Sequence, residues 1–344
     1  MNTLFSIIPT EVDTAFKVTG GPGFTNDTNM YIIPEAPEVV LQIKPPLLPF
    51  ITDNHLALIL PIIVYWSMGL FFHVLNERNM FARYRLHTPE ELEKRNKCSL
   101  WQVLRAVFIQ HSLQTISGIL LEMFEPHETT GHEARALWGI EHWFLLNGLL
   151  NVKLSKDMSW FVYYVIKPGF KLGVAFFIID TWQFFLHRYM HMNKFLYKHL
   201  HSVHHRLFVP YAFGALYNSV LEGFLLDTLG TGVAHLVTGL TARESVILYV
   251  FSTMKTVDDH CGYALPWDPF QLLFPNNAIY HDIHHQHFGI KTNFSQPFFI
   301  FWDKLFGTRY TQMDEYVAKQ HEIREAKYRE HLEQQREERE KKEQ

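Results

Sequence analysis

The sequence predicts an all-α integral membrane protein, with a transmembrane helical stem and a histidine-rich cap on the cytosolic side of the membrane. Three observations carry this prediction. Apolar stretches of about twenty residues recur along the chain, the length of a helix that crosses a bilayer. Histidines gather in short motifs at residues 187–191, 201–205 and 281–285, close to apolar stretches. Aromatic residues make up 15% of the chain, a composition suited to burial in lipid or around an apolar substrate.

Charge and cysteine content exclude some classes of partner and fold. The net charge of -4 and the absence of a basic block argue against nucleic acid as a partner. The two cysteines, Cys98 and Cys261, are too few for a disulfide framework and form no CxxC pair. We therefore expect a reducing, cytosol-facing interior and membrane lipid as the surroundings.

Composition divides the chain into three parts. Residues 1–50 form an arm with Lys17 and Lys44 as its only cations, which we expect on the lumenal side. Asn26-Asp27-Thr28 in this arm matches a glycosylation acceptor, a tripeptide that chance also explains. Residues 51–310 form the membrane domain, with three to five crossings. Residues 311–344 form a charged cytosolic tail, either one solvated helix or partly disordered.

The first predicted span is His55–Leu75, about 31 Å long as a helix. The loop that follows is basic, with six cations: Arg78, Arg83, Arg85, Lys94, Arg95 and Lys97. Because cytoplasmic loops carry an excess of Lys and Arg, this loop is predicted to face the cytosol and the N-terminal arm the lumen.

Two further spans follow from the apolar pattern. Trp101–Phe124 contains Gln110, His111 and other polar residues, so it must turn a polar face to neighbouring helices. We expect a packing role for His111 rather than a ligand role. Trp160–Leu186 runs directly into the first histidine motif, and Lys167-Pro168-Gly169 is expected to break it. The third crossing would place residues 187–205 in the cytosol.

The apolar segment 212–256 leaves the number of crossings open. It is interrupted by Glu222, Asp227 and several glycines. The histidine motifs before and after it must meet at one site, so it crosses the membrane twice, as a hairpin, or not at all. A shallow or paired-helix hairpin is favoured.

The histidine motifs are one HxxxH, His187 to His191, and two copies of HxxHH, His201 to His205 and His281 to His285. On a helix, positions i, i+3 and i+4 share one face, so each motif is expected to aim its imidazoles at a common spot. One zinc ion needs only three or four protein ligands, so eight histidines indicate two metal ions. The chain contains no HExxH, the zinc-peptidase helix motif. For oxidation chemistry iron is preferred over zinc, with copper still open.

Further residues are candidates to complete this site. His260 is a ninth candidate ligand, while His199 and His287 fall outside the repeating spacing. Three aspartates are candidates to orient the imidazoles: Asp180, Asp259 and Asp282. Asp180 is equally well explained as a buried residue paired with another helix. Asp259 has three alternatives, as a ligand, an orienting group or a solvated charge.

The motifs and their flanks resemble a known family. HxxxH and two HxxHH motifs around membrane spans are similar to the membrane fatty acid hydroxylase/sterol desaturase superfamily. Four segments narrow the resemblance to the fungal sphinganine C4-hydroxylases: Asp180–His187, Thr256–Pro266, Pro275–Gln286 and Phe288–Phe294. The resemblance runs from about Leu47 to Tyr316.

The resemblance implies a non-haem di-iron monooxygenase of the endoplasmic reticulum membrane. It would add a hydroxyl at C4 of sphinganine (dihydrosphingosine) or dihydroceramide, giving phytosphingosine or phytoceramide. Electrons would come from NAD(P)H through a separate cytochrome b5 and its reductase. The final Lys341-Lys342-Glu343-Gln344 resembles a dilysine retrieval signal of that membrane, although chance also explains a Lys-Lys in so charged a tail.

The family's ligands carry over residue by residue onto nine positions: His187, His191, His201, His204, His205, His260, His281, His284 and His285. In the fatty-acid hydroxylase branch a further histidine stands four residues before the counterpart of His260, where this chain has Thr256. A water or Asp259 is expected to complete the coordination there.

Two other functions are compatible with the histidine pattern. A sterol C4-methyl oxidase or desaturase of the same superfamily would use the same ligands on another substrate. A non-catalytic membrane protein that binds metal would show stoichiometric iron without O2-dependent turnover.

Overall fold

The computed structural model describes residues 15–16, 31–32 and 34–343. The possible glycosylation tripeptide at Asn26, most of the N-terminal arm and Gln344 lie outside these residues. The chain forms two compact units, one of residues 1–45 and 126–171 and the other of residues 46–125 and 172–344. The second unit holds all the candidate site residues.

The first unit contains two small antiparallel ribbons and two helices. Strand β1 (Ala15–Phe16) pairs with β2 (Tyr31–Ile32), and β3 (Gln42–Ile43) pairs with β4 (Thr129–Thr130). The helices are α4 (Glu133–Leu146) and α5 (Val152–Phe161). An ion pair of 2.7 Å between Lys44 and Glu128 supports the second ribbon.

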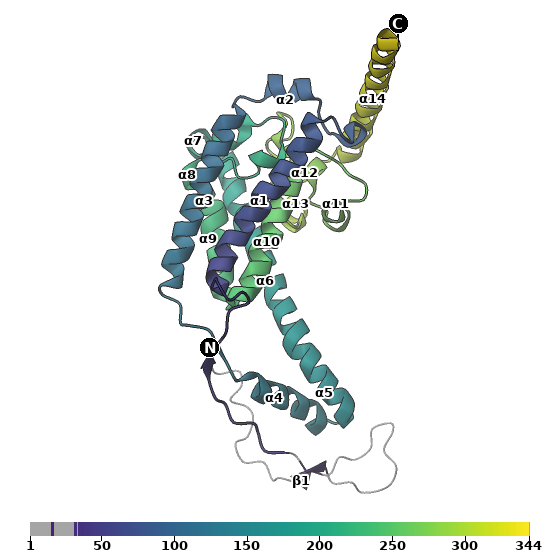
Figure 1. The fold of residues 1–344 in the computed structure, drawn as a ribbon. Coiled ribbons are helices and arrows are strands. Elements are labelled where there is room, and N and C mark those ends of the chain that lie inside the picture. Colours follow the sequence, from purple (N-terminus) through teal and green to yellow (C-terminus); the bar gives the residue numbers. More distant parts are fainter. Residues whose placement is uncertain (1–14, 17–30, 33, 344) are drawn as a thin grey trace. The chain divides into compact units, whose positions relative to one another are not determined.

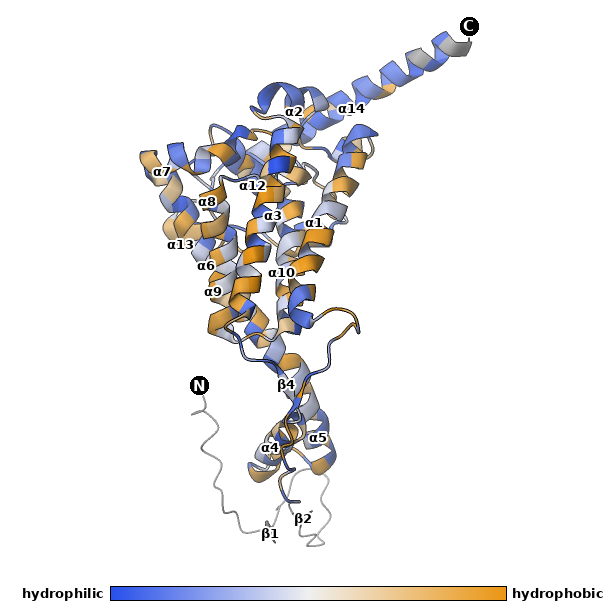
Figure 2. Ribbon diagram, turned by 60° about the vertical axis from the view of Figure 1, so that its left-hand side comes forward, coloured by the Kyte–Doolittle hydropathy of each residue, from blue (hydrophilic) through white to orange (hydrophobic). Residues whose placement is uncertain are grey.

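The second unit is built on a stem of long helices, with α1, α3 and α10 side by side in Figures 1 and 2. The stem consists of α1 (Asp53–Glu77), α3 (Leu100–Glu122), α6 (Lys167–Met192) from residue 172 onward, a helical run of α8 (Val220–Gly223), η5 (Phe224–Thr228) and α9 (Leu229–Thr238), and α10 (Ala242–Asp259). Thr52 begins α1 by accepting a hydrogen bond from the His55 amide.

Three helices in the described part of the chain are long and apolar enough to cross a membrane: Asp53–Glu77, Val152–Met192 and Val220–Thr238. The first agrees with the predicted span at His55–Leu75. The second predicted span does form helix α3, but its polar residues keep it out of this group. Figure 2 shows blue, hydrophilic positions along α3 among its orange ones.

The expected break at Lys167-Pro168-Gly169 is wrong. Val152–Met192 is helical throughout its 41 residues. A five-residue π-helical turn, η2 (Val162–Ile166), ends two residues before Pro168. Proline removes one backbone N–H and its ring crowds the carbonyl four residues before it, and a wider turn accommodates both effects. The helix therefore continues into the first histidine motif.

The segment 212–256 contains the paired-helix hairpin that the sequence favoured. Val220–Thr238 and α10 are joined at Gly239, whose φ of 58° is left-handed, and Thr241 caps α10. Near this turn Arg243 pairs with Asp53 at 2.7 Å, and His235 with Glu125 at 2.6 Å. Both helices return to the histidines at their other ends. The sequence offered two crossings or none for this segment, and a hairpin agrees with both.

The cap is formed by residues 78–99, 193–219 and 260–312. It contains short helices: η1 (Ala82–Tyr84), α2 (Pro89–Arg95), α7 (Lys194–His199), η3 (His201–Arg206), η4 (Ala212–Gly214), α11 (Pro269–Leu273), α12 (Ala278–His285) and α13 (Phe301–Phe306). The basic loop contacts the end of the third histidine motif, since Arg95 donates a hydrogen bond of 2.6 Å to the Gln286 side chain. The charged tail is one helix, α14 (Met313–Glu343), with Glu325 paired to Arg83.

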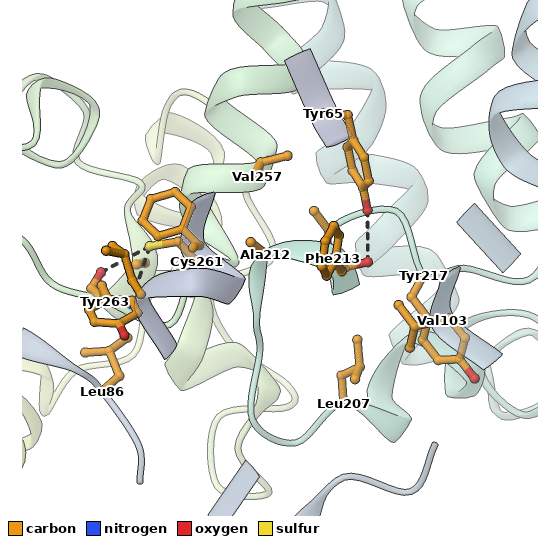
Figure 3. Close-up of a cluster of buried hydrophobic side chains, with 14 of the residues drawn as sticks. Tyr65, Leu86, Val103, Leu207, Ala212, Phe213, Tyr217, Val257, Cys261 and Tyr263 are labelled. Carbon is orange, nitrogen blue, oxygen red and sulfur yellow. Dashed lines mark hydrogen bonds between the residues drawn. The ribbon is translucent and has the colours of Figure 1, made fainter. Parts of the chain in front are cut away.

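A buried hydrophobic cluster joins the stem to the cap (Figure 3). Tyr65 of α1 donates a hydrogen bond of 2.9 Å to the Phe213 carbonyl in η4. Leu207 is fully buried in the same cluster, and its carbonyl oxygen lies 2.7 Å from Nδ1 of His285. The packing of this core therefore fixes a main-chain group that orients one of the candidate ligands.

Candidate metal centre

Among the described residues, the histidines expected to bind metal form two buried clusters. The five-histidine cluster contains His187, His191, His201, His205 and His284. The four-histidine cluster contains His204, His260, His281 and His285. In each cluster the candidate ligand atoms lie within 4.8 Å of one another. All nine predicted positions are included, whereas His111, His199 and His287 lie outside both.

The sequence suggested that each HxxHH motif aims its imidazoles at one spot. The structure shows instead that both motifs are divided between the two clusters. His201 and His205 belong to the five-histidine cluster, while His204 between them belongs to the other. The third motif is divided in the opposite sense, with His284 in the five-histidine cluster and its neighbours in the other. On the α-helix α12, which carries the third motif, positions i and i+4 differ by about 40° and position i+3 lies about 100° from i+4, which accounts for the division of that motif. Each motif therefore links the two clusters.

The side chains come from four elements whose ends meet. His187 and His191 lie on the last turns of α6, and the second motif lies on η3. The third motif ends α12, and His260 is the C-cap of α10. Asn277 begins α12 by accepting a hydrogen bond from the Tyr280 amide. Local capping and the ends of long helices thus place the imidazoles.

The imidazole tautomers fit cations between the rings. Nδ1 of His187 faces the Phe294 carbonyl at 2.8 Å, and Nδ1 of His201 faces the Glu222 carboxylate. A neutral imidazole carries one N–H, which these acceptors hold at Nδ1. The two Nε2 atoms then present lone pairs to each other at 3.1 Å. Such an arrangement is repulsive unless a cation binds both atoms.

The spacing of the Nε2 atoms also distinguishes between metal geometries. Adjacent Nε2 atoms are separated by 2.9–3.2 Å in the five-histidine cluster. In the other cluster His281 lies 2.9 Å from His260 and 3.0 Å from His285. For metal–nitrogen bonds of about 2.1 Å, ligands at right angles are about 3.0 Å apart and tetrahedral ligands about 3.4 Å apart. The donor sets fit five- or six-coordinate metals better than tetrahedral zinc.

Burial keeps these ligands neutral, the form in which imidazole binds metal. Burial lowers the pKa of His204 to about 4. It lowers the pKa of His260 and of His284 to about 3. Main-chain carbonyls orient these rings through Nδ1, from Tyr217 for His204, Thr256 for His260 and Thr292 for His284.

The three aspartates predicted to orient imidazoles have other hydrogen-bond partners. Asp180 accepts from the backbone amides of Phe298 and Phe299, at 2.9 and 2.7 Å. Asp259 pairs with the buried Lys255, so it is not part of the four-histidine cluster. Asp282 accepts from three side chains outside the clusters: His87, Gln286 and Tyr316. These carboxylates hold loops and helices together because buried donors must be satisfied.

The carboxylate that orients an imidazole of the clusters is Glu222, which faces His201. It is fully buried on α8 and faces Nδ1 of His201. In the sequence Glu222 is only an interruption of an apolar segment, 21 residues from His201. The one sequence signal for this role was a carboxylate inside the apolar stretch that follows a histidine motif.

Replacing Glu222 by Gln is expected to weaken metal binding by about 10- to 100-fold, because the His201 tautomer loses its anionic partner. Competition with a chelator measures this affinity. Glu125→Gln, which changes a carboxylate paired to His235 at the opposite end of the hairpin, is the matched control. Equal metal affinity in both variants would contradict the role given to Glu222.

A second carboxylate, Asp303, holds the backbone of Phe294, whose carbonyl faces His187. It is fully buried and accepts hydrogen bonds from the Tyr280 hydroxyl at 2.7 Å and from the amides of Phe294 and Ser295. Asp303→Ala leaves these donors unsatisfied, so we expect a loss of about 3 kcal/mol in stability. Thermal unfolding in detergent measures the loss, with the exposed Asp314→Ala as control. An unchanged melting temperature for Asp303→Ala would refute this account.

Two cavities of the second unit adjoin each other, and the inner one borders the clusters. The inner cavity is bordered by His201, His204, His260 and His281, from both clusters. The outer cavity lies between the stem helices and is lined by apolar side chains such as Ala57, Leu58 and Ile62, together with polar ones such as His111. The cavities share four lining residues: Gln183, Asp227, Thr256 and Pro297. His111 also packs edge-on against Tyr65, with its ring nitrogens unpartnered among the described residues.

Several known proteins that are similar to this chain are described as C4-hydroxylases or C4-monooxygenases of sphingolipids or sphinganine. The sequence profile described as fatty acid hydroxylase matches residues 172–308. The sphingolipid C4-hydroxylase of Saccharomyces cerevisiae is 52% identical, covering 87% of this chain and 84% of the relative. The protein of the same description in Schizosaccharomyces pombe is 47% identical, over 73% and 87% of the two chains. Sphinganine C4-monooxygenase 2 of Arabidopsis thaliana is 43% identical, over 75% and 88%.

Sterol-modifying relatives are more distant. Methylsterol monooxygenase 1 of Rattus norvegicus is 38% identical over 141 residues, which is 40% of this chain and 45% of the relative. This match covers less than half of either chain. No solved structure matches the chain significantly.

Proposed function

The chain belongs to the fatty acid hydroxylase family, and from this premise we propose that it is a monooxygenase that hydroxylates C4 of sphinganine or dihydroceramide. The products are phytosphingosine or phytoceramide. The reaction replaces a C–H bond by C–OH; one atom of O2 enters the product, and the other leaves as water with two electrons and two protons.

The observation that carries this proposal is the pair of histidine clusters at the wall of one cavity. We propose that each cluster holds one iron ion. When bound, a pair of redox-active metals supplies the O2 activation that side chains cannot provide. Four histidines of this cavity wall would bring both metals next to the substrate, and their burial keeps bulk water from the reacting carbon.

The cavities fit an amphiphilic substrate. The inner cavity has polar walls, including Asn218 and Asp227, and the outer cavity is lined by apolar side chains of the stem, such as Leu58 and Ile62, together with polar ones. C4 lies close to the polar head of a sphingoid base. We propose that the head and C4 occupy the inner cavity and that the hydrocarbon chain lies in the outer one.

The electron supply and location are proposed from the family and the charge distribution. Electrons reach the site from NAD(P)H through a separate cytochrome b5 and its reductase. The enzyme lies in the endoplasmic reticulum membrane, with the site facing the cytosol. The basic residues of the first loop support this orientation, because Arg95 contacts Gln286 beside the third histidine motif.

A test expresses the chain in membranes of a host that lacks sphinganine hydroxylation. Long-chain bases and sterols are followed by mass spectrometry, with and without O2 and NADH. We expect an O2-dependent trihydroxy base and unchanged sterols. An unchanged base pool with altered 4-methyl sterols would replace the proposed substrate by a sterol. Bound iron without turnover would indicate a metal-binding protein.

A further inference from the structure

Asp227 is a carboxylate at the boundary between the two cavities. It lies in the π-helical turn η5 and is one of the four residues that line both cavities. Single π-helical turns occur frequently at functional sites, because they redirect a side chain within a helix. Trp182 donates to the Leu225 carbonyl of this turn at 2.8 Å, which stabilises the irregular backbone.

The Asp227 carboxylate has weak partners within the protein. Gln183 and Asn218 each donate an amide hydrogen bond to it, and both bonds are long at 3.4 Å. No Lys, Arg or His forms an ion pair with Asp227 in the described part of the chain. The nearby Glu222 and Asp259, by contrast, pair with His201 and Lys255. Of the three carboxylates of the inner cavity, Asp227 is therefore the one held only by two long amide hydrogen bonds, with neither a buried cation nor a closely placed imidazole beside it.

Unpartnered polar groups continue from Asp227 along the outer cavity. The hydroxyls of Thr228 and Ser252 are buried without a hydrogen-bond partner among the described residues, as are both ring nitrogens of His111. Each of these residues lines the outer cavity. Buried polar atoms are normally satisfied, so this unsatisfied set, which shares a cavity with Asp227, indicates that the polar head of a ligand lies near the boundary while its hydrocarbon chain follows the apolar side chains of the outer cavity.

We propose that Asp227 binds the ammonium group of a free sphingoid base, with Asn218 and Gln183 as neighbouring hydrogen-bonding groups. This inference rests on the proposed function and names the form of substrate that the site prefers. An ammonium gives the carboxylate the cation it lacks, and charge-assisted hydrogen bonds are roughly twice as strong as neutral ones. The amide of an N-acylated base carries no charge and leaves the carboxylate unpaired.

This contact also explains how the position of hydroxylation is set. The amine nitrogen and C4 are three bonds apart, so fixing the amine leaves C4 little freedom. Four histidines of the two clusters line the same inner cavity as Asp227. The position of the amine then determines which carbon reacts, and the length of the hydrocarbon chain in the outer cavity does not change that carbon.

The test compares Asp227→Asn with the parent enzyme in its iron-loaded form, using sphinganine and N-acetylsphinganine as substrates. Asparagine keeps the shape and removes the charge. We expect the parent to prefer sphinganine. In the variant kcat/KM for sphinganine falls about 10- to 100-fold, mainly through KM, while N-acetylsphinganine changes less than about threefold. Iron content stays at the parental value.

The outcomes separate this inference from the proposed function. Glu125→Gln is the control for loss of a carboxylate away from the cavities, and should behave as the parent. If the parent is active and Asp227→Asn keeps its KM and preference for sphinganine, the inference is wrong. An equal loss on both substrates with intact iron also overturns it. If the parent hydroxylates neither substrate, the proposed function itself fails.

Discussion

His281→Ala is expected to reduce C4-hydroxylation to below about 0.1% of the parent and to lower the iron content from two ions to about one per chain. Nε2 of His281 lies between those of His260 and His285, at 2.9 and 3.0 Å. Its removal leaves the four-histidine cluster with three ligands at most. His284→Ala is expected to have the same effect on activity through the five-histidine cluster.

The control for these variants is His199→Ala. His199 is exposed on α7 and lies outside both clusters, so its loss should leave iron and activity unchanged. Iron content of the purified proteins and product formation in membranes are the two measurements. Activity retained in His281→Ala would contradict the assignment of the four-histidine cluster. Loss of both irons in each variant would show that the two sites do not bind metal independently.

Iron-free protein is expected to lose stability steeply as the pH falls below about 6.5, the pKa of an unfolded histidine. Burial lowers the folded-state pKa of His204 to about 4 and of His260 and His284 to about 3. Above pH 6.5 both states are neutral and these groups contribute no pH dependence. Between about pH 6.5 and 3 these histidines are protonated in the unfolded chain and neutral in the folded chain, so the folded state loses stability as the pH falls.

At pH 5 this difference costs about 2 kcal/mol for each such histidine, at 1.36 kcal/mol per pH unit. Buried carboxyls with a raised pKa, such as Asp259 at about 7, act in the opposite direction, so the histidine contribution is measured as a difference. We therefore expect the melting temperature of the iron-free protein in detergent to fall between pH 7 and pH 5.5 by roughly 2 °C more in the parent than in His284→Ala, which lacks one of these buried histidines. His199→Ala, which removes an exposed histidine, should show the same fall as the parent. An equal fall in the parent and in His284→Ala would mean that His284 is not buried as a neutral imidazole.

The candidate ligands could be predicted from sequence because their spacing is local. HxxxH and HxxHH place imidazoles within one helical turn, whatever the rest of the chain does. The assignment of each histidine to a cluster could not be predicted this way. His204 and His284 cross to the cluster opposite their neighbours, and that depends on how η3 and α12 are packed together. This packing comes from contacts distant in sequence, such as His285 with the Leu207 carbonyl.

Polar residues in apolar segments were the least predictable from sequence. Asp180 and Glu222 both interrupt apolar stretches, yet Asp180 holds a backbone loop and Glu222 faces His201. Sequence spacing cannot distinguish these roles, because each partner lies in a different element. The helix through Pro168 was also missed, since the π-helical turn that accommodates it has no strong residue signature.

The most direct test of the central claim follows the oxygen atom into the product. Purified iron-loaded enzyme, with cytochrome b5, its reductase and NADH, is given sphinganine under 18O2. We predict one 18O atom in the product, at the C4 hydroxyl, and two iron ions per chain. A C4 hydroxyl labelled from water, or turnover that persists after iron is removed, would contradict a di-iron oxygenase.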